Sequence, residues 1–314
     1  MSIVITGGAG FIGCNFIKYE LSHYDDNIIC IDSLTYAGSL DNLKKELKNP
    51  RFKFIQADIT DKKTIEKIFK ENDIDLVINF AAESHVDNSI KNPDIFTKTN
   101  ILGTQILMDA CLKYGVKRFH QVSTDEVYGD LELKEKDRFV ETSPLKPSSP
   151  YAASKASADL LVLSYARTYG LDITISRSSN NFGPYQHSEK FIPVVINAIN
   201  SDEEIPVYGN GKNMRDWIYV DDNCRAIDKI VRCGEIGEIY NICSCFEISN
   251  LELVKTISKI LNKKAKIKYV EDRKGHDMKY SMSYEKIVKE LNWLPKHSFL
   301  DGLRKTIAWY SKNK

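Results

Sequence analysis

Long apolar runs, an excess of one charge and a regular pattern of cysteines are all missing from this 314-residue chain. No stretch approaches the ~20 apolar residues of a membrane-spanning helix. Residues 2–6 form a strand-like apolar segment, with no charged signal-peptide region before it. Lys plus Arg is 44 and Asp plus Glu is 43, so no global field favours nucleic acid or a membrane surface. We therefore expect a cytoplasmic protein that holds any anionic ligand through a local cluster of side chains.

The seven cysteines are scattered and form no disulfide framework or CxxC pair. Cys243 and Cys245 are the only close pair, and no His or further Cys that could complete a metal site lies near them in the sequence. We expect reduced, buried thiols and no bound metal.

What the chain does have is an alternation of short β-rich runs and amphipathic segments over residues 1–125. Strands are expected at residues 3–6, 28–32, 52–57, 76–81 and 119–124, and helices most clearly at 60–71 and 93–114. This alternation predicts right-handed βαβ units on a parallel sheet. A helix from Tyr151 and a strand at 173–177 extend it, and beyond residue 185 the rhythm breaks into shorter, mixed elements.

The turn after the first strand reads TGGAGFIG at positions 6–13 and opens a helix, the context in which a Gly-x-Gly-x-x-Gly motif binds a dinucleotide. Gly7, Gly10 and Gly13 would let a pyrophosphate approach the N–H groups at the helix N-terminus. Asp32 ends the second strand, 19 residues beyond Gly13, where its carboxylate can accept from a ribose 2′-hydroxyl and would repel a 2′-phosphate. The pattern predicts NAD rather than NADP, the alternative being an ordinary glycine-rich turn with a capping Asp.

Residues after the third and fourth strands also belong to the expected cofactor site. Asp58 follows the third strand, and the small residues at 81–82 would let a cofactor lie close to the backbone. Ser84 and His85 come next and could reach ligand phosphates or sugar. A single His in a loop is equally consistent with an ordinary surface position.

The motif at 123–129 reads STDEVYG and follows an apolar strand. It therefore places a hydroxyl and two adjacent acids at the carboxyl edge of the sheet, where open α/β folds bind ligands. Tyr151 and Lys155, in the sequence YAASK, are four residues apart and share one face of a helix. Because a Tyr has an ordinary pKa near ~10, a tyrosine base at neutral pH needs a neighbouring cation such as Lys155. We interpret the two segments as one active site.

The second half of the chain carries basic clusters at 189–190, 215–217 and 272–277. Most charge clusters are solvated faces, but Arg215 follows a Gly-Asn-Gly turn and suits bidentate phosphate recognition. Helices are expected at 251–261, 284–291 and 299–310. Overall we predict an α/β protein with a Rossmann-type doubly wound parallel sheet. Residues 1–179 would form the NAD-binding domain and 180–314 mainly a smaller C-terminal α/β substrate-binding domain.

Together these motifs resemble the nucleotide-sugar 4,6-dehydratases of the extended short-chain dehydrogenase/reductase superfamily. The resemblance runs in order from residue 3 to residue 310, and its further segments are DSLTYAG (32–38), AAESHVD (81–87), SSNNFGPY (178–185), EKFIP (189–193), RDWIYV (215–220) and DRKGHD (272–277). The chain departs from the family pattern at Cys14, Ser33, Asn88, Cys243-Ser244 and Lys274. The change at 88 removes a family charge, and the change at 274 loosens a substrate loop.

The resemblance implies a lyase of deoxysugar biosynthesis, as in the route to rhamnose, that dehydrates a nucleoside-diphosphate glucose with tightly bound NAD. It implies that Tyr151 takes the proton of the C4 hydroxyl and that Lys155 supports it. Glu126 would take the C5 proton and Asp125 would protonate the departing C6 hydroxyl, with Thr124 near the C4 oxygen. The implied cofactor positions are Gly7, Gly10, Phe11, Ile12, Gly13, Asp32, Ser33, Leu34, Thr35, Asp58, Ile59, Phe80, Ala81, Ala82, Ser84, Thr99, Tyr151, Lys155 and Asn181. The implied substrate positions are Ser84, His85, Thr124, Asn180, Glu189, Lys190, Arg215, Asn250, Arg273 and His276.

Other functions share parts of this pattern. A C4 epimerase or simple dehydrogenase would keep the glycines, Tyr151 and Lys155, but needs no acid and base at 125 and 126. A UDP-glucuronate decarboxylase would lack the Asp, and a non-catalytic NAD-sensing regulator has no use for the Tyr–Lys pair. The resemblance implies dTDP-glucose as the substrate. UDP-glucose stays open as the alternative, because the two bases differ by one methyl group, and methyl-sized discrimination is worth only ~1–3 kcal/mol.

The helical segments 93–114 and 149–169 are apolar around much of their circumference, more than one buried face needs. Members of the superfamily commonly pair such helices between subunits. We therefore expect a homodimer.

Overall fold

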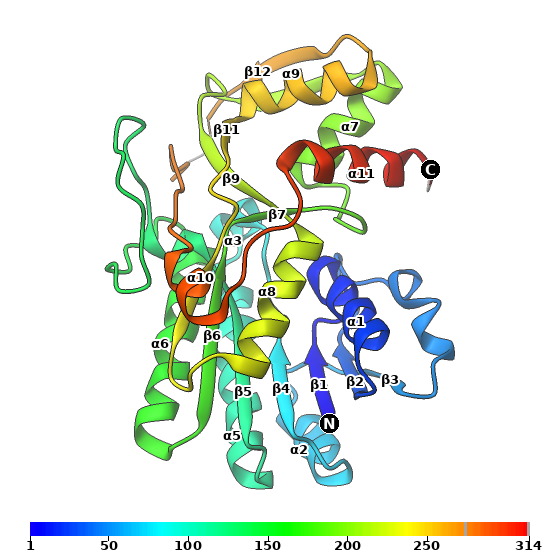
Figure 1. The fold of residues 1–314 in the computed structure, drawn as a ribbon, viewed down its shortest axis with the longest axis vertical. Coiled ribbons are helices and arrows are strands. Elements are labelled where there is room, and N and C mark those ends of the chain that lie inside the picture. The colour runs from blue at the N-terminus through cyan, green and yellow to red at the C-terminus, as the bar shows by residue number, and fades with distance from the viewer. Residues whose placement is uncertain (273–274, 313–314) are drawn as a thin grey trace.

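The computed structural model spans the chain and describes residues 1–272 and 275–312. Its centre is a seven-stranded parallel sheet with the strand order β10-β6-β5-β4-β1-β2-β3 (Figure 1). The strands are β1 (Ser2–Thr6), β2 (Asn27–Asp32), β3 (Phe52–Gln56), β4 (Leu76–Asn79), β5 (Arg118–Thr124), β6 (Asp172–Ser178) and β10 (Ile239–Ile242). This sheet and its crossover helices confirm the α/β, Rossmann-type fold expected from the sequence.

The sheet is buried on both faces, as parallel sheets usually are. β1 and β4 are short runs of Ile, Val and Leu with almost every side chain buried. From β1 the sheet grows in one direction through β2 and β3, and in the other through β4, β5, β6 and β10. The strand order therefore reverses between β1 and β4. The crevice above such a switch point is where open α/β sheets bind their ligands.

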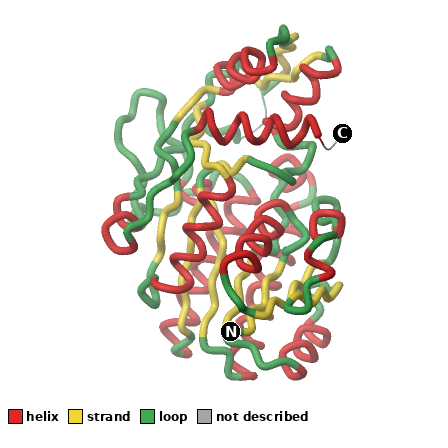
Figure 2. The backbone as a smooth tube through the Cα atoms, turned by 45° about the vertical axis from the view of Figure 1, so that its right-hand side comes forward, coloured by secondary structure: helices red, strands yellow, loops and turns green. Residues whose placement is uncertain are grey.

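Helices cover both faces of the sheet (Figures 1 and 2). On one face α1 (Phe11–His23), α8 (Val220–Cys233) and α10 (Glu285–Leu291) share a core with the strands. On the other face α2 (Lys62–Glu71), α5 (Thr104–Tyr114) and α6 (Pro150–Tyr169) do the same. The remaining helical segments of this part are the 3-10 helices Leu40–Leu43, Glu46–Lys48 and Asp125–Tyr128, α3 (Val86–Lys91), α4 (Pro93–Phe96) and a π-helical segment (Thr97–Gly103) leading into α5.

A second lobe lies beyond the carboxyl ends of the strands, at the top of Figure 1. It contains a three-stranded sheet of β7 (Asn180–Phe182), β9 (Met214–Tyr219) and β11 (Glu247–Ser249), and the parallel pair β8 (Glu204–Tyr208) and β12 (Lys266–Val270). The helices α7 (Phe191–Ser201), α9 (Asn250–Leu261) and α11 (Phe299–Lys312) pack on these strands around a separate apolar core.

The expected elements are present, with small shifts at their ends, and the helix expected at 93–114 contains the π-helical segment Thr97–Gly103. The strand expected at 76–81 ends at Asn79, because the chain leaves the sheet there to form a wall of the cleft described below. The helix expected at 60–71 begins only at Lys62, because the Asp61 side chain caps it by accepting from the Thr64 N–H at 3.3 Å. The domain division after residue 179 stays a prediction, and residues 220–242 cross it, since α8 and β10 return to the main sheet.

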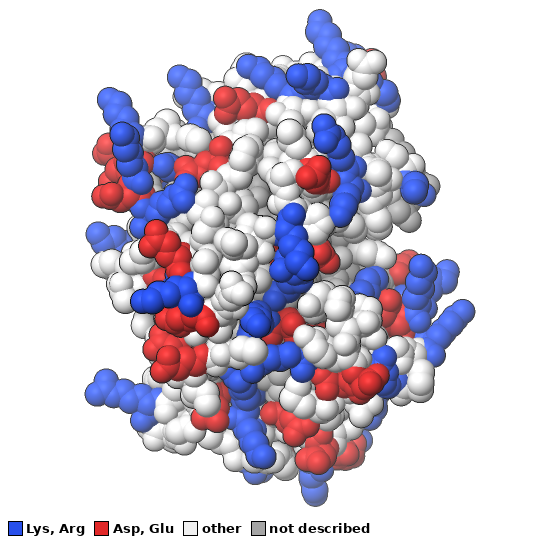
Figure 3. All heavy atoms as spheres, viewed as in Figure 1, with Lys and Arg blue, Asp and Glu red and all other residues white. Residues whose placement is uncertain are grey.

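Charges of both signs are interspersed over the face shown in Figure 3, as the balanced composition suggests. Among the helices of the described residues, none is long and apolar enough to cross a membrane.

Candidate active site

A cleft of about 350 Å³ opens at the carboxyl ends of the central strands and brings most of the expected site residues together. It is lined by every expected cofactor position except Leu34. It is also lined by all the expected catalytic residues: Thr124, Asp125, Glu126, Tyr151 and Lys155. The glycine turn and the STDEVYG and YAASK motifs therefore contribute to one site, although they are far apart in the sequence.

The glycine turn is shaped so that larger residues would not fit. Gly7 has φ +65°, and a Cβ added there would lie 2.6 Å from the backbone N of Ala81. A Cβ on Gly13 would lie 2.4 Å from the carbonyl oxygen of Gly7. α1 begins directly after Gly10, and its first N–H groups have no side-chain cap. This cradle fits a pyrophosphate at a helix N-terminus.

Asp32 is held beside this turn by backbone N–H groups. Its Oδ2 accepts from the N–H of Ala9 at 2.9 Å and its Oδ1 from the N–H of Leu34 at 2.8 Å. Burial raises the pKa of Asp32, and these two N–H groups oppose the shift. A carboxylate oxygen can accept more than one hydrogen bond, so the side chain can still receive ribose hydroxyls. Leu34 thus contacts Asp32 through its backbone N–H and does not line the cleft, and its part in cofactor binding stays a prediction.

The acids of the STDEVYG motif stand at the end of β5, in a 3-10 turn formed by Asp125–Tyr128. Asp125 is buried, and its Oδ1 accepts from the Thr124 hydroxyl at 3.1 Å. Its Oδ2 has no hydrogen-bond partner among the described residues. Burial, and then the charge of Glu126, raise the pKa of Asp125 well above its ordinary value. Both effects favour the protonated acid, and Oδ2 is available to a ligand.

Tyr151 and Lys155 lie on the first turns of α6, whose start is fixed by Ser149 accepting from the Ala152 N–H at 3.1 Å. Lys155 donates to the carbonyl oxygen of Val122 at 2.7 Å. Burial lowers the pKa of Lys155 to about 8, opposed by Asp159.

The phenol of Tyr151 behaves differently from the sequence-based expectation. Burial raises its pKa, the charges of Glu126 and Asp125 add to this, and the Thr124 hydroxyl opposes it. The Lys155 ammonium is bonded to a β5 carbonyl instead of the phenol. Tyr151 is thus a neutral phenol in the ligand-free protein.

The expected substrate positions fall into two groups. Ser84, Thr124, Asn180 and Lys190 line the cleft, and Lys190 donates to the Ser84 carbonyl at 3.3 Å. The side-chain oxygens of Asn180 and its neighbour Asn181 are buried without a hydrogen-bond partner among the described residues. Such oxygens indicate a place where ligand donors would be received.

The second group does not line this cleft. His85 and Glu189 face each other, with 3.6 Å between Nε2 and Oε2. The guanidinium of Arg215 donates to the Asp277 carbonyl at 2.8 Å and stacks on the Tyr280 ring at 4.3 Å. The two other members lie in the second lobe: Asn250 is the first residue of α9, and His276 Nδ1 is 2.6 Å from Oδ1 of Asp272. Arg273 lies outside the described residues.

Several residues of the site were not expected from the sequence. Ser178, Ser179, Gln186 and His187 line the cleft. The two serines belong to the SSNNFGPY segment and could have been found from it. Tyr280 carries no motif, and only the fold brings its ring against Arg215.

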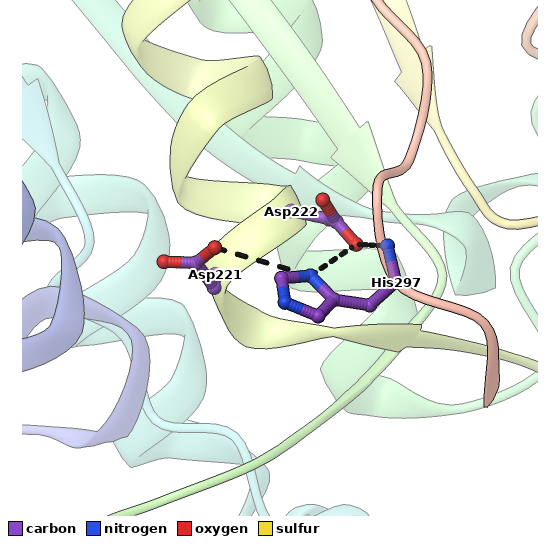
Figure 4. Close-up of side chains that lie close together, drawn as sticks. All are labelled: Asp221, Asp222 and His297. Carbon is purple, nitrogen blue, oxygen red and sulfur yellow. Dashed lines mark hydrogen bonds and ion pairs between the residues drawn. The ribbon is translucent and has the colours of Figure 1, made fainter. Parts of the chain in front are cut away.

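One cluster among the described residues has the composition of a metal site: Asp221, Asp222 and His297 (Figure 4). The possible ligand atoms of Asp222 and His297 already have partners. Asp222 accepts from Arg225 at 2.7 Å and from the backbone N–H groups of residues 296 and 297 at 2.8 and 2.9 Å. His297 Nδ1 lies 3.0 Å from the same carboxylate, and the Lys305 ammonium meets Nε2 at 2.8 Å. The cluster ties the start of α8 to the segment before α11.

Known proteins resemble this chain over its full length. The family model described as GDP-mannose 4,6 dehydratase matches residues 4–306. The chain is 48% identical to the low-salt glycan biosynthesis protein Agl12 of Haloferax volcanii, over 99% of this chain and 98% of that protein. It is 44% identical to a dTDP-glucose 4,6-dehydratase of Escherichia coli, over 100% of this chain and 94% of that protein.

Among solved structures, the dTDP-glucose 4,6-dehydratase DesIV from Streptomyces venezuelae, crystallised with NAD, matches with a TM-score of 0.96. The two chains are 44% identical, and the match covers 100% of this chain and 98% of DesIV. The chain therefore belongs to the GDP-mannose 4,6 dehydratase family, which confirms the resemblance to nucleotide-sugar 4,6-dehydratases drawn from its motifs.

Proposed function

We propose that this chain is a dTDP-glucose 4,6-dehydratase, which converts dTDP-glucose into dTDP-4-keto-6-deoxyglucose and water. The observation that carries the proposal is the placement of Asp125 and Glu126 in the same cleft as Tyr151. Oxidation at C4 needs only a base and a hydride acceptor. Loss of water across C5 and C6 needs an acid and a base in addition, and this cleft supplies both.

The cleft fits NAD, because the glycine turn leaves room for a pyrophosphate and Asp32 presents a carboxylate to a ribose. When bound, NAD would supply a reversible hydride acceptor for the oxidation at C4 and the reduction at C6. No metal is needed for this chemistry, and the absence of a resident metal stays a prediction.

The acid for the leaving hydroxyl is Asp125. A general acid must hold its proton at the working pH, and burial does this for Asp125 by raising its pKa. Its unpartnered Oδ2 gives the proton to the C6 hydroxyl, which leaves as water. Glu126 is less buried and takes the C5 proton, which the C4 ketone has made acidic.

Tyr151 receives the proton of the C4 hydroxyl. Its phenol must give up its own proton first, and burial opposes this. Lys155 is the cation one helical turn away and is charged below its pKa of about 8, so it is placed to stabilise the phenolate. Thr124 joins the two halves of the site, because its hydroxyl bonds Asp125 and opposes the rise in the pKa of Tyr151.

The test is to incubate the purified protein separately with dTDP-glucose and UDP-glucose and to follow the 4-keto-6-deoxy product by mass and alkaline absorbance. We expect product from dTDP-glucose at the higher kcat/KM. A higher kcat/KM with UDP-glucose would support the dehydratase reaction but show that UDP-glucose, and not dTDP-glucose, is the preferred substrate. No dehydrated product from either sugar would refute the proposal.

The proposed enzyme is a homodimer. Along α6, Leu160 is 59% exposed and Tyr169 is 60% exposed, and Leu112 on the neighbouring α5 is also exposed. Apolar residues exposed along adjacent helices suit a subunit interface. Sedimentation at micromolar concentration should give twice the 35.8 kDa of one chain, and a single species of one chain would contradict this. The cytoplasmic location and the link to rhamnose remain predictions.

A further inference from the structure

The segment Cys243-Ser244-Cys245, directly after β10, places two thiols together. Their sulfur atoms are 3.8 Å apart, and both approach the carbonyl oxygen of Met282, at 3.2 and 3.7 Å. Cys245 has φ +59°, a left-handed conformation that tightens the turn. A disulfide requires a sulfur–sulfur distance of ~2.05 Å, so the two atoms need to approach by about 2 Å.

The two thiols are chemically unequal. Cys243 is completely buried, and burial raises its pKa well above the ordinary value. Cys245 is partly exposed, and the Cys243 thiol and the charge of Arg138 lower its pKa against the opposing effect of burial. Because the thiolate is the reactive form of cysteine, Cys245 is the thiol that an oxidant meets first.

The residue between them holds a buried acid next to the active site. Ser244 donates to Oδ1 of Asp216 through its N–H at 3.0 Å and through its hydroxyl at 3.3 Å. The same oxygen accepts from the Ser179 hydroxyl at 2.7 Å, and Ser179 lines the active-site cleft. The position of Ser244 is therefore coupled to the cleft through a single carboxylate.

We propose that Cys243 and Cys245 are a redox pair that hydrogen peroxide closes to an intrachain disulfide, drawing Ser244 away from Asp216 and slowing turnover. The Cys245 thiolate attacks one oxygen of the peroxide, the O–O bond breaks, and a sulfenic acid and hydroxide form. The Cys243 sulfur then attacks the Cys245 sulfur and expels the second oxygen as water. Two thiols lose two electrons and two protons, and one peroxide becomes two waters.

The first test is chemical. Oxidised protein should be about 2 Da lighter than reduced protein. A protease that cuts after Glu releases residues 239–247, which contain both thiols but not Cys233. This peptide should resist alkylation after oxidation and accept two alkyl groups after reduction with a dithiol. Full alkylation of the peptide from oxidised protein would overturn the proposal, whether or not the chain is a dehydratase.

The second test is functional and rests on the proposed dehydratase activity. Losing a hydrogen bond to a charged group changes an equilibrium or rate constant by about tenfold or more. We therefore expect kcat/KM to fall by that order when the disulfide forms, and to recover when a dithiol reduces it. Cys245→Ser should be resistant. Cys233→Ser, which changes an exposed thiol elsewhere, should lose activity like the parent. Equal loss in Cys245→Ser and the parent, or a disulfide with unchanged kcat/KM, would overturn the link to the site.

Discussion

Replacing Asp125 with Asn tests the role of this side chain as an acid while leaving the rest of the site unchanged. Burial raises the pKa of Asp125 and so favours its neutral form, for which Asn is a neutral substitute of nearly the same shape. The amide oxygen of Asn can keep the 3.1 Å hydrogen bond from Thr124. We therefore expect the free energy of unfolding to change by less than ~1 kcal/mol.

The reaction should respond very differently. An amide cannot give a proton to the C6 hydroxyl, and losing a general acid typically lowers a rate by ~10²–10⁴, or about 3–5 kcal/mol in activation free energy. Formation of 4-keto-6-deoxy product should slow by this factor. Oxidation at C4 can still begin, so absorbance of the reduced nicotinamide should build up when substrate is mixed with the variant.

The controls distinguish chemistry from damage to the fold. Tyr151→Phe should suppress both the absorbance change and the product, because it removes the group that takes the C4 hydroxyl proton. Asp137→Asn, which changes an exposed acid that does not line the cleft, should match the parent. Product formation by Asp125→Asn at the parent rate, with unchanged thermal stability, would refute the assignment of Asp125 as the acid.

Two further predictions concern the cofactor cradle and acid stability. In Gly13→Ala the new Cβ would lie 2.4 Å from the backbone oxygen of Gly7, so the turn must shift and NAD affinity, measured by calorimetry, should fall at least about tenfold; unchanged affinity would contradict the cradle. Burial lowers the pKa of His120 from 6.5 to about 3, so the neutral form favours folding above pH 6.5 and stability is lost as the pH falls from there towards 3. This residue alone should cost about 2 kcal/mol between pH 8 and pH 5, and urea unfolding of His120→Gln should show a smaller loss over that interval, whatever its stability at pH 8. An equal loss in both proteins would argue against a buried neutral His120.

The parts of the fold that could be predicted from the sequence are those determined by short stretches of neighbouring residues. The alternation of strand and helix predicted the succession of strands along the chain from β1 to β6, and the glycine spacing predicted the cofactor turn. Each of these patterns depends on neighbouring residues alone. The return of β10 to the main sheet was not predicted, because a strand of four residues, Ile239–Ile242, carries no pairing information of its own.

The site shows the same limit. Motif residues such as Asp125 and Lys155 line one cleft, and their catalytic roles stay predictions. The neutral state of Tyr151 was not predicted, because it depends on burial and on two carboxyl groups from another segment. Arg215 was expected as a phosphate ligand, whereas in the ligand-free protein it is bonded to the backbone of Asp277, 62 residues away. Because a guanidinium carries five N–H donors, the bond to Asp277 leaves donors for a phosphate, and the role of Arg215 in substrate binding stays a prediction.

The central claim is that one active site both oxidises C4 and reduces C6 of the same sugar. The most direct measurement uses dTDP-glucose with deuterium at C4, in ordinary water, with the product analysed by mass and NMR. The account predicts that the deuterium appears at C6 of the same product molecule, and that with unlabelled substrate in deuterated water the solvent label enters at C5. Deuterium retained at C4, as in an epimerase, or found on released NADH, as in a simple dehydrogenase, would contradict it.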